Sequence, residues 1–306
     1  MKVLLALDGS APSLVARDLV ANLRWPTGTT VHLVSAYQAP IDWTGGVGST
    51  MAWVGDVDDA VRDQLGDELR AMAEPLVAGG LSVEYHVARG RAADAITNVA
   101  VEVRADLIVT GSRGRGPIRS MLLGSVAAEV AADAAVPVLV ARRTDVERLL
   151  FATDGSSNAG RVPELVAGWG IFGGATADVV AVSVPDPPGY ALMANLYTLG
   201  SDAIAKSREK DAERAQLDAG AMAERLRDAA IPATPHVRRG DAAAQILDAA
   251  MEFNTDLIVT GSRGLGQLER LLLGSVARNV LVHAGCSVLI VRAGSDAEPS
   301  QEVNPT

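Results

Sequence analysis

A glycine-rich segment of the chain has residue types and spacing that suit the binding of phosphate groups. It runs from Gly111 through Gly114 and Gly116 to Gly124 and Ser125. Closely spaced glycines allow positive φ angles, so that successive backbone N–H groups can point into one concave surface. Gly124-Ser125 is expected to begin a helix, whose free N–H groups and positive dipole end attract an anion. No Gly-Lys-Ser/Thr follows the glycines, so the segment is not a Walker A loop.

The same segment occurs a second time, 150 residues further along the chain. DLIVTGSRG stands at 106–114 and again at 256–264, and LLGSVA stands at 122–127 and again at 272–277. A tight turn followed by a helix cap would explain a single copy without any ligand. Two intact copies favour a ligand site, because a merely permissive turn would be expected to diverge. The second copy contains Gly261, Gly264, Gly266, Gly274 and Ser275.

An acidic turn is also repeated, directly after the first apolar run of each copy. Asp8-Gly9-Ser10 matches Asp154-Gly155-Ser156. Asp-Gly-Ser is typical of turns and helix caps, which is the alternative interpretation. Its recurrence where the chain should face the glycine segment favours contact with a ligand.

The elements that must position these residues alternate between short apolar runs and helical patterns. This alternation predicts βαβ units, a mostly parallel sheet and helices on both of its faces. If the first and fourth strands are neighbours, the order is 3-2-1-4-5, and Asp8 meets the glycine segment at the switch point where ligands bind. The expected strands are 3–7, 31–34, 82–87, 107–110 and 138–141 in copy one, and 149–153, 178–183, 234–237, 257–260 and 288–291 in copy two.

The repeat predicts two tandem open-sheet, Rossmann-like domains, at residues 1–143 and 147–293, joined by a short polar link. Residues 294–306 are polar and contain proline, and are expected to be disordered. Two long connections, 37–56 and 185–200, differ between the copies and are interpreted as either binding loops or variable linkers.

Composition excludes several classes of function. The net charge is −10, from 27 basic and 37 acidic residues, whereas a nucleic-acid-binding protein needs a basic surface. An anion would therefore have to be held by local backbone dipoles. Cys286 is the only cysteine, lies in an apolar stretch and is interpreted as a buried residue in a cytoplasmic protein. Nowhere do 18 apolar residues follow one another, so no membrane span is expected.

The spacing G-x-x-G, nine residues, G-S, together with the aspartate after the first strand, resembles the ATP-binding class of universal stress proteins. The whole chain is similar to tandem universal stress proteins of the actinobacterial type. The resemblance covers about residues 1–142 and 148–292. It implies ATP, with Mg²⁺, as the ligand of each domain.

The resemblance also implies which residues line the two sites. The aspartates would meet the ribose or a phosphate-bound Mg²⁺, and backbone groups after the second and third strands would flank the adenine. The first site would use Asp8, Gly9, Ser10, Ala36, Val87, Gly111, Ser112, Arg113, Gly114, Arg115, Gly116, Pro117, Gly124, Ser125 and Val126. The second would use Asp154, Gly155, Ser156, Val184, Val237, Gly261, Ser262, Arg263, Gly264, Leu265, Gly266, Gln267, Gly274, Ser275 and Val276.

Other repeated polar residues allow more than one interpretation. Arg113 and Arg263 could pair with phosphate oxygens or be solvated. His86 and His236 recur on the third strands, but two histidines in separate domains do not make one metal site, so no metal ligands are predicted.

Three functions remain open. The first is an ATP-binding regulator of a stress response with little or slow hydrolysis, because no dedicated base or Walker lysine is found. The second is an adenylyl-transfer or ATPase enzyme, and the third is an interaction scaffold with empty pockets. The fifth strands, at 137–142 and 287–292, would be apolar sheet edges, which invite pairing. The resemblance implies that they pair within the chain, with further association into a homodimer.

Overall fold

The computed structural model describes residues 1–38, 51–114, 123–183, 201–262 and 273–292. In the first repeat, the strands are β1 (Lys2–Ala6), β2 (Thr30–Tyr37), β3 (Ser82–Arg89), β4 (Leu107–Gly111) and β5 (Val138–Ala141), and the helices are α1 (Ala11–Asn22), α2 (Met51–Met72), α3 (Glu74–Ala78), α4 (Ala92–Val103) and α5 (Ser125–Asp133). In the second repeat, the strands are β6 (Arg148–Thr153), β7 (Thr176–Ser183), β8 (Ala233–Arg239), β9 (Leu257–Gly261) and β10 (Ser287–Val291), and the helices are α6 (Ser157–Trp169), α8 (Ser201–Asp228), α9 (Ala242–Glu252) and α10 (Ser275–His283).

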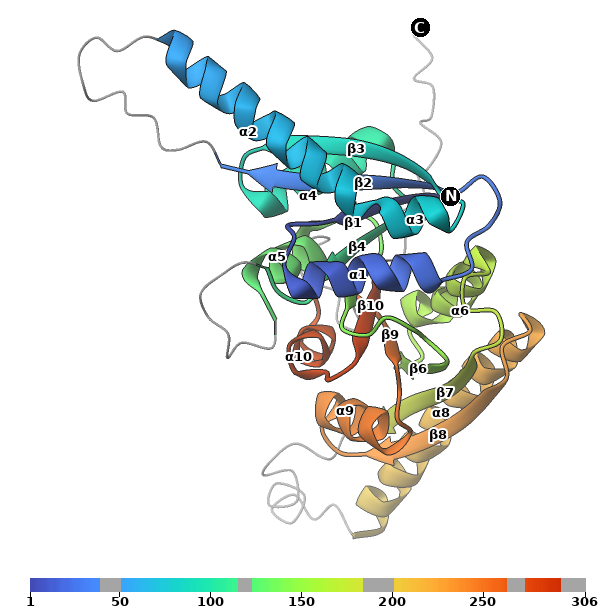
Figure 1. Ribbon diagram of the computed structural model, residues 1–306. Helices are drawn as coiled ribbons and strands as arrows, with labels where there is room; N and C mark the ends of the chain where they lie inside the picture. The colour runs from blue at the N-terminus through green and yellow to red at the C-terminus, as the bar shows by residue number, and fades with distance from the viewer. Residues whose placement is uncertain (39–50, 115–122, 184–200, 263–272, 293–306) are drawn as a thin grey trace, which may run out of the picture.

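All of the expected strands form one continuous sheet of ten (Figure 1). Its order is β3-β2-β1-β4-β5-β10-β9-β6-β7-β8, so each repeat has the predicted order 3-2-1-4-5. The strands within each repeat are parallel, whereas β5 and β10 pair antiparallel, with Leu139 opposite Leu289. The fifth strands, at 137–142 and 287–292, therefore close each other's edges within the chain, as the family resemblance implied.

Helices cover both faces of the sheet (Figure 1). The cores show α1, α2, α3, α6 and α8 on one face, and α4, α5, α9 and α10 on the other. The alternation of a strand sends successive side chains to opposite faces, so Leu139 joins the first core while Val138 and Val140 join the second. Each core contains residues of both repeats, because the sheet is shared. None of the helices that the structure describes is both long and apolar enough to cross a membrane.

The long helical pattern at 57–77 is interrupted in the structure. Helix α2 ends at Met72, and the short α3 begins at Glu74 with Pro75 in its first turn. Proline lacks an N–H and clashes with the preceding helical turn, so it favours a new helix start. Helix α2 also begins at Met51, so the expected connection at 37–56 is partly helical; its residues 39–50, and residues 185–200 of the other, lie outside the described part of the chain.

Two arginines connect the repeats at the central strand pair. The guanidinium of Arg142 donates from Nη2 to the carbonyl of Leu281 at 2.7 Å. In the reverse direction, Arg292 donates to the carbonyl of Ala131 at 2.8 Å and to that of Ala132. Each cation thereby reaches the C-terminal end of the last helix in the other repeat, where free carbonyls and the negative dipole end stabilise positive charge.

Candidate functional site

A cleft of about 1000 Å³ lies in the first repeat at the carboxyl ends of β1 and β4. This is the switch point of the strand order, where β1 continues to β2 on one side and β4 on the other. Of the predicted site residues, the cleft is lined by Asp8, Ser10, Ala36, Gly111, Arg113, Gly114, Gly124, Ser125 and Val126. The structure therefore brings the acidic turn and both ends of the glycine segment together.

The acidic turn is held in shape by its own side chains. Gly9 has φ 74°, a left-handed conformation that glycine adopts without strain. The Asp8 carboxylate accepts from the Ser10 backbone N–H at 3.0 Å and from the Ser10 hydroxyl at 2.6 Å. Ser10 in turn caps helix α1 by accepting from the N–H of Ser13. Much of the turn's geometry is thus structural, as the alternative interpretation of Asp-Gly-Ser predicted, while one carboxylate edge remains directed at the glycine segment.

The glycines are needed because backbone segments approach closely, and less because of unusual φ angles. A Cβ on Gly111 would stand 2.5 Å from the Pro12 carbonyl oxygen, so only glycine lets β4 end against the start of α1. A Cβ on Gly114 would stand 2.7 Å from Asp8 Oδ2. Gly114 does not use the positive φ that glycine allows, since it is not among the glycines with left-handed backbones. Its small size instead allows the loop to pass beside the Asp8 carboxylate.

The two ends of the glycine segment are joined by one hydrogen bond in each repeat. The N–H of Gly124 donates to the Ser112 carbonyl at 2.7 Å, and the N–H of Gly274 donates to that of Ser262 at 2.8 Å. Ser112 is buried and does not line the cleft. Its backbone closes the base of the loop and sets the direction in which the following helix begins.

The helices that follow the loops begin without side-chain caps. Gly124 and Gly274 are the N-cap residues of α5 and α10, and neither start is capped by a side chain. By contrast, Ser10 and Ser156 cap α1 and α6. An uncapped helix start leaves N–H donors available to an external acceptor. In the first repeat these donors belong to the cleft, whose lining includes the exposed Ser125.

The remaining walls of the cleft are mostly apolar or carry hydroxyl groups. These residues have no distinctive chemistry that a sequence pattern could reveal, and they come together only when α1, β2, α4, β4 and α5 pack against one another. They include Pro12, Ser13, Val34, Ala92, Ile96, Thr110, Leu123 and Ala127. Among the described lining residues, only Asp8 and Arg113 carry ionisable side chains.

Some predicted residues lie elsewhere or outside the described structure. Gly9 does not line the cleft, and Val87 and Val237 pack on the opposite face of the sheet. His86 and His236 stand on β3 and β8, the two edges of the sheet, so they do not form one site. Outside the described residues lie Arg115, Gly116, Pro117, Val184, Arg263, Gly264, Leu265, Gly266 and Gln267.

The second repeat has a similar acidic turn and a similar helix start in its described residues. Gly155 has φ 71°, and the Asp154 carboxylate accepts from the Ser156 N–H at 3.0 Å. Gly261 ends β9, and Ser275 and Val276 open helix α10 after Gly274. The acidic turn and the helix start therefore recur with the same roles at the ends of β6 and β9.

Known proteins are similar to this chain in sequence and in fold. The model of the Universal stress protein family matches residues 1–142 and 146–292. A universal stress protein of Thermus aquaticus is 32% identical over 141 residues, which cover 46% of this chain and 97% of that protein. Universal stress protein YxiE of Bacillus subtilis is 29% identical over 145 residues, covering 46% of this chain and 98% of that protein.

The whole two-repeat architecture also occurs in a solved structure. The crystal structure of a universal stress protein from Archaeoglobus fulgidus aligns with a TM-score of 0.65 and 21% identity, covering 96% of this chain and 97% of that chain. The family match extends over both repeats, and this likeness spans both with a shared fold. The chain belongs to the universal stress protein family and contains two of its domains in tandem.

Proposed function

We propose that this protein binds ATP with Mg²⁺, one nucleotide in each domain, and acts as a nucleotide-dependent regulator of a stress response. The observation that carries the proposal is the convergence of the uncapped start of α5 with the Asp8 turn in a cleft of about 1000 Å³. Uncapped N–H groups suit phosphate oxygens, and a nearby carboxylate suits a phosphate-bound Mg²⁺. A protein with a net charge of −10 needs such local donors to hold a polyanion.

The two sides of the cleft suit the two ends of a nucleotide. The phosphates would lie at Gly124, Ser125 and Val126, while Val34, Ala36 and Ile96 offer an apolar wall for the base. Of the described residues, none in the lining is a lysine, histidine or cysteine. Phosphoryl transfer needs a positioned nucleophile and charge neutralisation at the γ-phosphate. This lining supports binding with little or slow hydrolysis rather than rapid turnover.

Thermal-shift titration of the full chain with MgATP, AMP and cAMP tests the proposal. Binding to the native state stabilises it by RT ln(1 + [L]/Kd), so the melting temperature rises with the logarithm of ligand concentration once that concentration exceeds Kd. We expect MgATP to stabilise the protein, and mass spectrometry of the natively purified chain to identify a co-purified adenine nucleotide. No shift with any of the three nucleotides would favour the scaffold interpretation, and pyrophosphate release with an acceptor substrate would favour the adenylyl-transfer enzyme.

The contribution of the Ser125 hydroxyl to ATP affinity can be measured separately from that of the backbone N–H groups at the helix start. In a chain whose second site is disabled by Gly274→Val, Ser125→Ala removes one hydroxyl while the helix start remains. Loss of a hydrogen bond to a charged group costs about 1.5–3 kcal/mol, which corresponds to a roughly ten- to hundredfold weaker Kd.

We also expect a homodimer in solution, to be checked by light scattering with and without nucleotide.

A further inference from the structure

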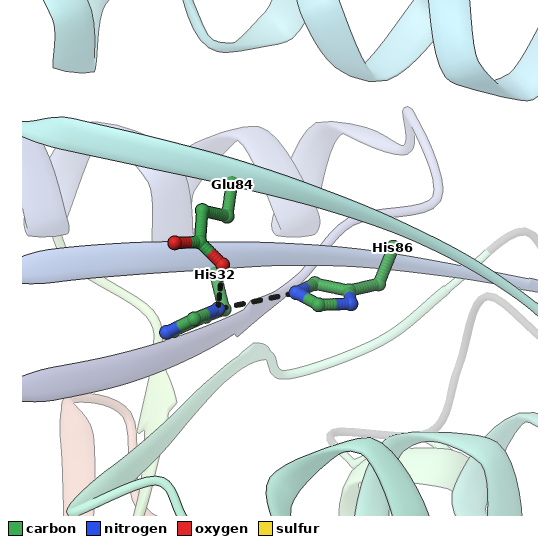
Figure 2. A group of neighbouring side chains, drawn as sticks. All are labelled: His32, Glu84 and His86. Atoms are coloured by element: carbon green, nitrogen blue, oxygen red, sulfur yellow. Dashed lines mark hydrogen bonds and ion pairs between the residues drawn. The ribbon is translucent and has the colours of Figure 1, made fainter. Parts of the chain in front are cut away.

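Three potential metal ligands of the first domain lie side by side at one edge of the sheet (Figure 2). His32 stands on β2, and Glu84 and His86 stand on the edge strand β3. The parallel register places Glu84 opposite His32, and His86 follows two residues later on the same face. None of the three lines the cleft.

The ligand atoms converge around one ring nitrogen. His32 Nδ1 lies 3.1 Å from His86 Nε2 and 3.3 Å from Glu84 Oε2, and all three atoms lie within 4.8 Å of one another. An imidazole nitrogen carries either one proton or one lone pair, so Nδ1 can make one well-directed hydrogen bond but not two. A cation placed among the three atoms would accept a lone pair from each and would satisfy all of them together.

The two separations that involve His32 Nδ1 match the spacing of ligands around a small divalent ion. Zinc binds histidine nitrogens and carboxylate oxygens at about 2.0–2.2 Å, and in tetrahedral geometry such ligands lie roughly 3.3 Å apart. The observed 3.1 Å and 3.3 Å separations are close to that value. Two histidines and one carboxylate are also a donor set that imidazole-preferring metals such as Zn²⁺ favour.

The three side chains differ in their exposure to solvent. The His32 side chain is 5% exposed, whereas that of Glu84 is 60% exposed. A metal ion could therefore enter from the Glu84 side and keep water as a fourth ligand. His32 Nε2 is buried without a hydrogen-bond partner in the described structure. A hydrogen-bond partner on the ring nitrogen that does not bind the metal strengthens metal binding by about 10–100-fold. Because His32 Nε2 has no such partner among the described residues, we expect a moderate affinity for the metal ion.

The second domain provides an internal comparison. By strand register, Asp178 takes the place of His32, Thr234 that of Glu84, and His236 that of His86. There, His236 Nε2 and Asp178 Oδ1 lie 2.7 Å apart and satisfy each other as a pair. The threonine in place of the glutamate removes the carboxylate ligand, so the second domain has only two of the three groups.

We infer that His32, Glu84 and His86 form a binding site for a zinc-like divalent metal ion, and that it is the one such site among the residues that the structure describes. The inference is independent of nucleotide binding, because it uses none of the cleft residues. Val34, the register partner of His86, lines the cleft, so the two sites lie on adjoining positions of β2.

The test uses untagged full-length protein, stripped with EDTA and free of nucleotide. Calorimetric titration with Zn²⁺ should give one equivalent, and Co²⁺ should give the visible absorption of a four-coordinate site. Glu84→Gln and His86→Gln should each weaken Zn²⁺ binding at least tenfold, because each removes one ligand. Glu84 is exposed, so its replacement should leave the fold intact, as circular dichroism can verify.

His236→Gln is the matched control, since it alters the equivalent strand position of the second domain, and it should bind Zn²⁺ like the parent. The inference is overturned if the parent shows no saturable Zn²⁺ binding below the millimolar range. It is also overturned if Glu84→Gln and His86→Gln both bind like the parent, or if only His236→Gln loses binding.

Discussion

The guanidinium of Arg142, just after strand β5, donates to the carbonyl of Leu281 in helix α10 at 2.7 Å. A second nitrogen of the same group donates to the carbonyl of Cys286 at 3.3 Å. These bonds cross from the first domain to the second, and burial lowers the pKa of Arg142 as the environment excludes water. The arginine therefore holds the two domains together from within.

Replacing Arg142 with alanine should destabilise the whole chain. It leaves the Leu281 and Cys286 carbonyls without this charged donor, and loss of such a bond costs about 1.5–3 kcal/mol. Chemical denaturation followed by circular dichroism measures the free energy of unfolding. Arg70→Ala is the control, because Arg70 and Asp67 form an exposed pair at 2.7 Å that should contribute about 0–1 kcal/mol. Equal losses in the two variants would contradict the role assigned to Arg142.

The first domain alone, residues 1–143, should self-associate. Separation exposes the β5 edge, whose residues Val138–Ala141 are all buried in the intact chain. Unpaired apolar edge strands tend to pair with a strand of another molecule. Light scattering of the isolated half should show dimers or larger species, with the full chain as the comparison. A monodisperse, monomeric half would show that the β5–β10 pairing is dispensable.

Gly111→Ala should destabilise the first domain. The added Cβ would stand 2.5 Å from the Pro12 carbonyl oxygen and 2.7 Å from the Ser13 nitrogen, both of them backbone atoms. Overpacking of this kind costs about 1–3 kcal/mol.

Gly168→Ala is the matched control for Gly111→Ala. It lies within α6, and its new Cβ would meet nothing within 4 Å. Alanine is the better helix former by roughly 0.5–1 kcal/mol, so this variant should be slightly stabilised. Thermal unfolding of both variants provides the comparison, and a Gly111→Ala protein as stable as the parent would show that β4 and α1 can separate without cost.

Cys286 should react slowly with thiol reagents in the native chain. Its residue is 5% exposed, and burial raises the pKa of the thiol, so little of the reactive thiolate is present at neutral pH. Ellman's reagent should label the native protein roughly 100-fold or more slowly than the denatured protein, because labelling requires local opening. Rapid, stoichiometric labelling of the folded chain would contradict the packing described for β10.

Repetition made the fold predictable from the sequence. The apolar runs at 107–110 and 257–260 precede identical glycine segments. With the first and fourth strands taken as neighbours, this pattern predicted the strand order and the location of the cleft. Gly111 and Asp8 could be paired in advance because the carboxyl ends of neighbouring parallel strands meet. Glycine is needed at position 111 because the backbone passes close to Pro12, and this contact is visible only in the folded structure.

Other features depend on contacts that no local pattern reveals. The apolar wall formed by Val34 and Ile96 arises only when α4 packs on β2. His32 lies 54 residues before His86, and only the register of β2 with β3 brings them together. Period-two alternation on neighbouring strands could have indicated a shared face, but the pairing register that aligns them is a property of the sheet.

We propose that ATP phosphates lie at the starts of α5 and α10, and calorimetric titration of the full chain with MgATP tests this placement. Gly124 has φ −78° and ψ 156°, which any residue can adopt, but a Cβ there would press to 3.1 Å from Arg113 Cα. Gly124→Val should therefore displace the loop and block the helix start while the domain stays folded, with a greater loss of affinity than Ser125→Ala. We expect the titration to give two ATP molecules bound per parent chain and one per Gly124→Val chain. No saturable binding to the parent, or two sites retained in Gly124→Val, would contradict it.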